Sequence, residues 1–289
     1  KIFISYGDSK YFIHRKRIAF QAKSFSFFDH IEIYNRNDIS KEFSEKYKYI
    51  FNQKKGGGYF IWKIFMILEQ LNNMEEQDIL LYVDSGCTLN KNGKDRLVEY
   101  FDMLHNSNKS MLLFRSPNLI EREWATSEAL NFFNFEKDSI EATSTSFIAT
   151  AYFIKKTDFS IKFFQEYLNI INSDNNLITD FYANTRVQEN YFKAHRWDQT
   201  ILSLMSKKHN NYLEVKDETY FLLNPDEQYV YPILAVRDSI YTTWQKMKYL
   251  ILYPLNIRKV IFFGREQFYF KRTPLLIKFY KKLLLKFKN

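Results

Sequence analysis

The chain has 289 residues, enough for one large α/β domain or two small ones, and its 46% hydrophobic content excludes a globally disordered protein. The single cysteine, Cys87, excludes an internal disulfide and a zinc site built from cysteines, and it fits a reducing, cytoplasmic setting. The net charge is +9, but residues 1–240 hold 30 of the 42 basic and 32 of the 33 acidic residues. A nearly neutral body argues against a nucleic-acid enzyme, which more often carries basic charge across its main groove.

The first half of the chain alternates between predicted strands and helices. Apolar and β-branched runs predict strands at 1–6, 28–34, 78–83 and 111–114, and helical spacing of apolar residues predicts helices at 11–24, 59–72 and 95–104. Such alternation indicates an α/β fold with a mainly parallel sheet and helices on both faces.

The second half repeats this pattern more loosely. We expect helices at 123–133, 159–171 and 198–205 and a strand at 147–154, with Thr157 and Asp158 as an N-cap pair. Acidic residues nearly vanish beyond 235–245, which places a domain boundary there. We therefore predict a domain at 1–238 and a basic segment at 239–289.

The third predicted strand ends at a carboxylate. Asp84 directly follows an apolar run, and Ser85 and Gly86 let the backbone turn away. Ligands of α/β sheets bind outside the carboxyl ends of strands, so Asp84 is a candidate for holding a divalent metal or a sugar phosphate. The alternative is that Asp84 only caps the next segment.

A run of three glycines precedes the helix expected at 59–72. A turn of this kind can present backbone N–H groups to phosphate, and Lys63 could add a positive charge one turn later. The sequence is neither a P-loop nor a dinucleotide-binding fingerprint. The alternative is a flexible loop before a core helix, with Trp62 packed inside.

A third polar cluster precedes the helix expected at 198–205. Asp198 could deprotonate a sugar hydroxyl or, with Gln199, grip donor hydroxyls, and Arg196 could neutralise a diphosphate leaving group. The alternatives are an N-cap for Asp198 and a surface ion pair for Arg196. His195 has no HxxxH or cysteine partner, which favours a structural role.

Taken in order, the three clusters resemble those of bacterial GT-A-fold glycosyltransferases of surface-glycan (capsule or lipopolysaccharide) biosynthesis. The family pattern is Gly-x-Gly-Tyr-Trp-x-Trp-Lys-Pro, then Asp-x-Gly-Cys, then His-Arg-x-Asp-Gln-Ser. This chain departs from it in having Phe60 for the first Trp, Ile64 for Pro and Thr200 for Ser. The resemblance covers about residues 1–210 and implies a GT-A-like, Rossmann-like catalytic domain.

The resemblance also implies roles for single residues. Asp84 and Asp198 would be catalytic, with His195, Arg196 and Gln199 contacting the acceptor or phosphate. Donor and nucleotide contacts would come from Ser5, Tyr6, Gly7, Gly58, Trp62, Lys63, Asp84, Ser85 and Gly86. Asp84 takes the place of the first Asp of an Asp-x-Asp motif, and Gly86 replaces the second. Dependence on Mn²⁺ or Mg²⁺, with Asp84 as ligand, therefore stays open.

The last 49 residues carry 12 Lys and Arg against one acid, Glu266. Residues 274–289 predict an amphipathic helix that lies in a membrane interface, supported further back by Trp244, Phe262 and Phe263. Its basic side would hold Lys278, Lys281, Lys282, Lys286 and Lys288. No window approaches the roughly 18 uninterrupted apolar residues of a membrane-spanning helix.

Three functions follow from these patterns. The leading one is a transferase that moves a sugar from a nucleotide-diphosphate donor, by default a UDP-sugar, to a glycan or lipid-linked acceptor at the inner face of the cytoplasmic membrane. The second is a non-catalytic peripheral module that binds anionic lipid and a partner. The third, a nucleic-acid enzyme, is disfavoured by the neutral body, and we expect no nucleic-acid partner.

Overall fold

The computed structural model describes residues 1–219, 230–235, 258–262 and 265–269. The chain divides into two compact units, Lys1–Ala235 and Val236–Asn289. Nearly all described residues belong to the first unit, which holds the three polar clusters. The domain boundary expected after residue 238 stays a prediction.

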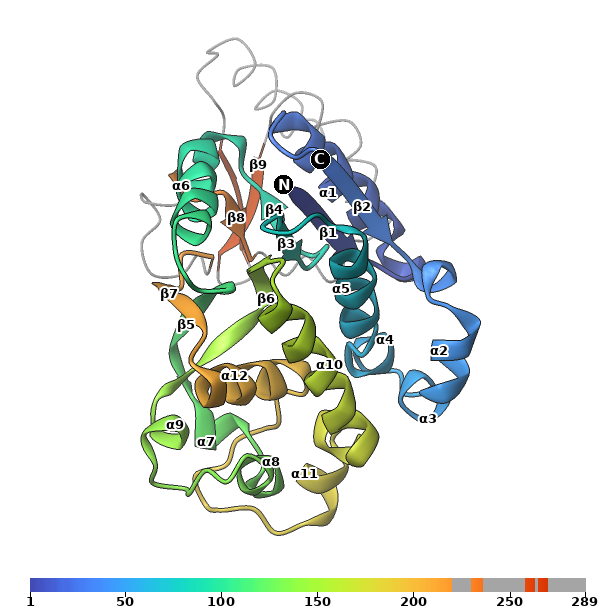
Figure 1. Ribbon diagram of the computed structural model, residues 1–289, viewed down its shortest axis with the longest axis vertical. Coiled ribbons are helices and arrows are strands. Elements are labelled where there is room, and N and C mark those ends of the chain that lie inside the picture. The colour runs from blue at the N-terminus through green and yellow to red at the C-terminus, as the bar shows by residue number, and fades with distance from the viewer. Residues whose placement is uncertain (220–229, 236–257, 263–264, 270–289) are drawn as a thin grey trace, which may run out of the picture. The chain divides into compact units, whose positions relative to one another are not determined.

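A six-stranded sheet forms the centre of the first unit, in the order β2-β1-β3-β6-β5-β7 (Figure 1). Its strands are β1 (Ile2–Tyr6), β2 (His30–Tyr34), β3 (Ile79–Val83), β5 (Met111–Ile120), β6 (Thr145–Lys155) and β7 (Tyr212–Lys216). The pairs β1–β2, β1–β3 and β5–β7 are parallel, whereas β6 runs antiparallel to both of its neighbours. A short second sheet pairs β4 (Thr88–Leu89) with β8 (Ile233–Leu234).

Helices cover both faces of the sheet, as expected for the α/β fold. The longer ones are α1 (Phe12–Ser24), α5 (Trp62–Asn73), α6 (Lys94–His105), α10 (Asp158–Ser173) and α12 (Asp198–His209). The shorter ones are α2 (Lys41–Lys46), α3 (Lys48–Phe51), α4 (Gly56–Tyr59), α7 (Glu121–Trp124), α8 (Ser127–Phe132), α9 (Ile140–Thr143) and α11 (Phe181–Thr185).

Two hydrophobic cores lie on opposite faces of the sheet. In β3, Leu80 and Tyr82 pack with α5, α10 and α12, whereas Leu81 and Val83 pack with α1 and α6 (Figure 1). All four side chains are buried, which explains why β3 is a continuous apolar run without polar alternation. The mainly parallel sheet flanked by helices is therefore confirmed.

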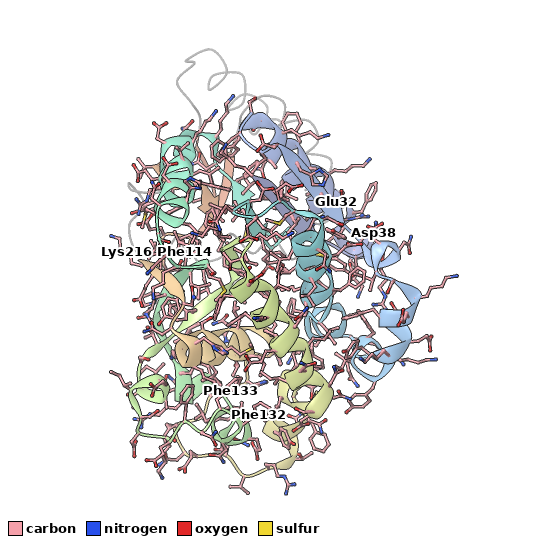
Figure 2. The ribbon with its side chains drawn as sticks, in the orientation of Figure 1. Glu32, Asp38, Phe114, Phe132, Phe133 and Lys216 are labelled. Carbon is pink, nitrogen blue, oxygen red and sulfur yellow. The ribbon has the colours of Figure 1, made fainter. Side chains whose placement is uncertain are left out.

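The element boundaries differ from the prediction where turns interrupt helical spacing. The helix expected at 123–133 is two short helices, α7 and α8, because Thr126 caps a new start by accepting a hydrogen bond from the backbone N–H of Ala129. At the end of α8, Phe133 is buried while its neighbour Phe132 is exposed (Figure 2). Thr157 caps α10 as expected, and Asp158 is the first helical residue.

In the second unit the structure describes an antiparallel pair of strands, β9 (Arg258–Phe262) and β10 (Arg265–Tyr269). The amphipathic helix expected at 274–289 lies outside the described residues. None of the helices within the described ranges is long and apolar enough to cross a membrane.

Candidate active site

Three charged side chains from distant parts of the chain meet at the carboxyl end of β3. The ammonium Nζ of Lys63, in the first turn of α5, lies 2.7 Å from Oδ2 of Asp198 and 3.4 Å from Oδ1 of Asp84. Asp84 directly follows β3, and Asp198 is the first residue of α12. One residue from each of the three sequence clusters therefore takes part in a single charged group, the Lys63 triad.

Lys63 is buried, with 3% of its side chain exposed. It also donates a hydrogen bond to the carbonyl oxygen of Ala149 in β6, at 2.8 Å. Burial lowers the pKa of Lys63, but the charges of Asp198 and Asp84 outweigh burial and raise the pKa above its usual value. The lysine thus stays protonated and offsets one of the two negative charges beside it.

Asp84 is the most exposed member of the triad. Its side chain is 33% exposed, against 8% for Asp198. Tyr82, two residues earlier on the same strand face, donates its hydroxyl hydrogen to Oδ1 of Asp84. The backbone N–H of Asp84 donates to the carbonyl of Thr150 in β6 at 2.8 Å, which fixes the carboxylate at the strand end.

Asp198 is more deeply buried than Asp84, and it does not cap its helix. Trp197 occupies the N-cap position of α12, without a side-chain capping bond, while the Asp198 carboxylate points to Lys63. Burial raises the pKa of Asp198 to about 6, although Lys63 opposes this rise. The hydroxyl of Tyr167 donates to the Asp198 carbonyl at 2.9 Å and anchors the start of the helix.

The glycine run forms a strained turn that leads into α5. Residues 56–60 all have positive φ, which only glycine adopts readily, and Tyr59 and Phe60 adopt it as well. A side chain at Gly58 would meet the Cα of Phe51 at 2.9 Å. The backbone N–H groups of Gly57 and Gly58 donate to carbonyls of Lys54 and Lys55, so the turn satisfies these groups itself.

Trp62 packs inside the protein. It is 4% exposed, and its ring stacks on Tyr6 at the end of β1 with centroids 3.8 Å apart. Its indole N–H donates to the carbonyl of Gly56 at 3.0 Å. Burial raises the pKa of Tyr6 to about 12, with Asp8 adding to the rise and Arg36 and Arg15 opposing it. The end of β1 therefore lies among mixed charges.

Asp180, in no predicted cluster, ties the glycine-rich turn to the loop before α12. Its carboxylate accepts hydrogen bonds from Lys55 Nζ at 2.7 Å, from the Tyr59 hydroxyl at 3.0 Å and from the Trp197 indole at 2.7 Å. Trp197 has a φ of 50°, a strained value for a bulky residue. Asp180 thus connects the turn that precedes Lys63 to Trp197, the residue that precedes Asp198.

Three of the residues expected beside the nucleotide, Ser5, Gly7 and Ser85, lie at the carboxyl ends of β1 and β3. Ser5 is fully buried, and its hydroxyl has no hydrogen-bond partner among the described residues. Gly7 packs so closely that an added side chain would lie 3.2 Å from Oγ of Ser85. Arg17 of α1 donates to the carbonyls of Ser85 at 3.0 Å and Cys87 at 2.8 Å, and so holds the turn after Asp84.

The other residues of the third cluster contact residues outside the triad. His195 is buried, and its Nε2 donates to the carbonyl of Leu177 at 2.9 Å. Arg196 lies over the ring of Trp124, 4.3 Å from its centroid. Gln199 donates to Oγ of Ser146 at 3.2 Å. Their predicted contacts to acceptor or phosphate therefore stay predictions.

The residues present do not suit a resident divalent metal. Mg²⁺ and Mn²⁺ need several oxygen ligands, and residue 86 has no side chain to offer. No group of three His, Cys, Asp or Glu side chains with metal-binding geometry occurs among the described residues. The Lys63 ammonium already lies between the two nearest carboxylates.

Some of the missed residues carried a signal in the sequence. Tyr82 is two residues before Asp84, so strand alternation places both side chains on one face of the sheet. Tyr167 and Asp180 lie outside any motif, and only the folded chain brings them to the site. The same holds for Ala149, which contributes through its backbone carbonyl rather than its side chain.

Comparison with known proteins gives similar backbones but no close relative. No family model matches the chain, and no curated protein matches it. A glycosyltransferase involved in glycosylation of the major capsid of PBCV-1 is 9% identical, with a TM-score of 0.47 over 87% of this chain and 98% of that one. The galactosyltransferase LgtC is 13% identical, with a TM-score of 0.42 over 75% and 74%. Mouse xyloside xylosyltransferase 1 is 10% identical, with a TM-score of 0.43 over 83% and 98%. Likeness at this level does not decide function.

His195 should make the free energy of unfolding depend on pH. Burial lowers the pKa of His195 from its usual value of 6.5 to about 4. The unfolded chain therefore binds a proton between these pH values that the folded chain does not, and stability falls as the pH drops below 6.5. Relative to pH 8, His195 should cost about 2 kcal/mol of unfolding free energy at pH 5.

Urea unfolding at both pH values, for the wild type and His195→Gln, measures this difference. The glutamine keeps a donor for the Leu177 carbonyl and does not titrate, so the variant should lose about 2 kcal/mol less than the wild type. An identical pH dependence of the two proteins would show that His195 does not titrate as described.

Removing the Asp180 carboxylate should weaken the attachment of both the glycine-rich turn and Trp197. In Asp180→Ala, three donors lose a charged acceptor, which should lower the unfolding free energy by about 2 kcal/mol. Asp180→Asn keeps one acceptor oxygen and should fall between this variant and the wild type. Near-ultraviolet circular dichroism should change in Asp180→Ala as Trp197 loses its fixed position, and an unchanged spectrum would contradict this role.

Proposed function

We propose that the chain is a glycosyltransferase that moves a sugar from a nucleotide-diphosphate sugar to a hydroxyl acceptor. The observation that carries the proposal is the Lys63 triad, in which residues from three separate motifs, 135 positions apart at most, share hydrogen bonds and charge. The motifs occur in the order and spacing of the family that the sequence resembles. The three residues meet at the carboxyl end of β3, and α/β sheets bind their ligands outside the carboxyl ends of strands.

The site contains the groups that sugar transfer requires. Asp84 is exposed enough to accept hydrogen bonds from hydroxyls of the donor sugar. Asp198, with a pKa of about 6, is suited to take a proton near neutral pH. Arg15 and Arg36 place positive charge near the Tyr6 hydroxyl, beside the negative charges of Asp8 and Asp38, and these arginines are the groups that would stabilise a diphosphate leaving group.

The finer assignments rest on the sequence. A UDP-sugar is the proposed donor, and a glycan or lipid-linked acceptor of capsule or lipopolysaccharide synthesis is the proposed acceptor. The excess of basic over acidic residues in 241–289 supports attachment of the enzyme to the inner face of the cytoplasmic membrane.

A thermal-shift screen against UDP, GDP, CMP and their sugar conjugates tests the proposal, because a ligand of the folded state raises the melting temperature. We expect one nucleotide family to stabilise the protein.

In Asp84→Asn, turnover with that sugar nucleotide should fall about 100-fold or more, while the variant stays folded because Asp84 is partly exposed.

Asp78, at the opposite end of β3, provides the matched control. Its side chain is 37% exposed, and Asp78→Asn removes one carboxylate next to the same strand without touching the triad. This variant should keep wild-type turnover. Equal activity of Asp84→Asn and the wild type would remove Asp84 from the mechanism, and a flat screen with a clean melting transition would favour the non-catalytic membrane module.

The basic segment can be tested in the full-length chain. Replacing Lys281, Lys282, Lys286 and Lys288 by Gln should weaken binding to anionic vesicles steeply, since each lysine near such a surface contributes about 1 kcal/mol. Co-sedimentation with phosphatidylserine-containing vesicles measures the loss, with neutral vesicles as the reference. Equal binding of both proteins would contradict a membrane role for this segment.

A further inference from the structure

The charge arrangement around Lys63 differs from that of a metal-binding carboxylate site. The ammonium lies within ion-pair distance of both Asp84 and Asp198, and it donates hydrogen bonds to Asp198 and to the Ala149 carbonyl. An ammonium group has three donors, so two hydrogen bonds and the ion pair surround it. One positive charge beside the two neighbouring carboxylates is therefore supplied by the chain itself.

Each carboxylate also has one oxygen committed. Oδ1 of Asp84 accepts from Tyr82 and lies beside Lys63, and Oδ2 of Asp198 accepts from Lys63. A divalent ion bound to Asp84 would lie close to the buried ammonium, and like charges in a poorly solvated site repel strongly. The ion would also lack the ligand that a carboxylate at position 86 would provide, because that residue is Gly86.

We propose that Lys63 is a built-in cation that takes the place of a divalent metal in this site, so that the chain binds its sugar nucleotide without metal. Lys63 holds the paired aspartates together, and the exposed side of Asp84 then receives the donor directly. This inference rests on the proposed transferase function and goes beyond it, because it specifies how the site is charged when the donor arrives.

The first test uses the wild-type protein. Titration calorimetry with UDP, GDP, CMP and their sugar conjugates is carried out in EDTA and again with Mn²⁺, and electron paramagnetic resonance records Mn²⁺ binding to the protein alone. We expect the stabilising nucleotide sugar to bind with affinities within about twofold in the two conditions, and Mn²⁺ alone to stay free.

The second test removes the built-in cation. Lys63→Met leaves two carboxylates without their counter-charge, so affinity for the nucleotide sugar in EDTA should fall about tenfold or more. Mn²⁺ should restore part of this affinity, because the bare pair can then accept a cation.

Lys207→Met is the matched control for loss of a buried lysine. Lys207 in α12 lies 2.7 Å from Glu121, with side chains 4% and 1% exposed, and its hydrogen bonds go to the carbonyls of Glu141 and Ser144. Both variants should lower the melting temperature, since each leaves a buried carboxylate without its partner. Only Lys63→Met should change nucleotide-sugar affinity, which separates loss of the site's charge from loss of stability.

The outcomes distinguish this inference from the function on which it rests. Binding that is at least about tenfold tighter with Mn²⁺ in the wild type would overturn the built-in cation and leave the transferase function standing. No binding of any nucleotide sugar in either condition would overturn the function, and the inference with it. If Lys63→Met does not fold, the wild-type measurements alone decide the question.

Discussion

The buried ammonium of Lys63 is the interaction on which the site depends. Burying one charge is unfavourable, and burying it between two carboxylates is stable only when the hydrogen bonds are well formed. The structure meets this condition with hydrogen bonds to Ala149 in β6 and Asp198 at the start of α12, and with an ion pair to Asp84 after β3. A shift of any of these elements would leave a charge unpaired, so the triad fixes the sheet and two helices relative to one another.

Strain around the triad indicates what those hydrogen bonds hold in place. Positive φ values occur at consecutive positions of the glycine-rich turn and again at Trp197, immediately before Asp198. Strained backbone persists only where the surrounding structure fixes it, and such strain collects at functional sites. Asp180 connects the two strained segments through Tyr59 and Trp197. The Asp180 carboxylate therefore joins the two backbone segments that lead to Lys63 and to Asp198.

Sequence reasoning located the triad by its motifs but not by its contacts. Alternating apolar runs predicted the sheet, and the strand ending at Asp84 was found because a buried strand in this fold is apolar on both faces. Lys63 was expected to face the donor, whereas the structure buries it. Only three-dimensional packing brings Lys63 and Asp198 together. Asp180 carried no signal, because a lone aspartate in a polar loop resembles any other.

The antiparallel strand β6 explains why lysine suits this position. Because β6 lies next to β3 in the sheet, the carbonyl of Ala149 lies near the end of β3, where it accepts a hydrogen bond from Lys63. An ammonium is a compact charge with three donors that rotate to meet acceptors on different sides, whereas a guanidinium presents a planar fork suited to one carboxylate. A site that joins two aspartates and a carbonyl around one point therefore selects lysine.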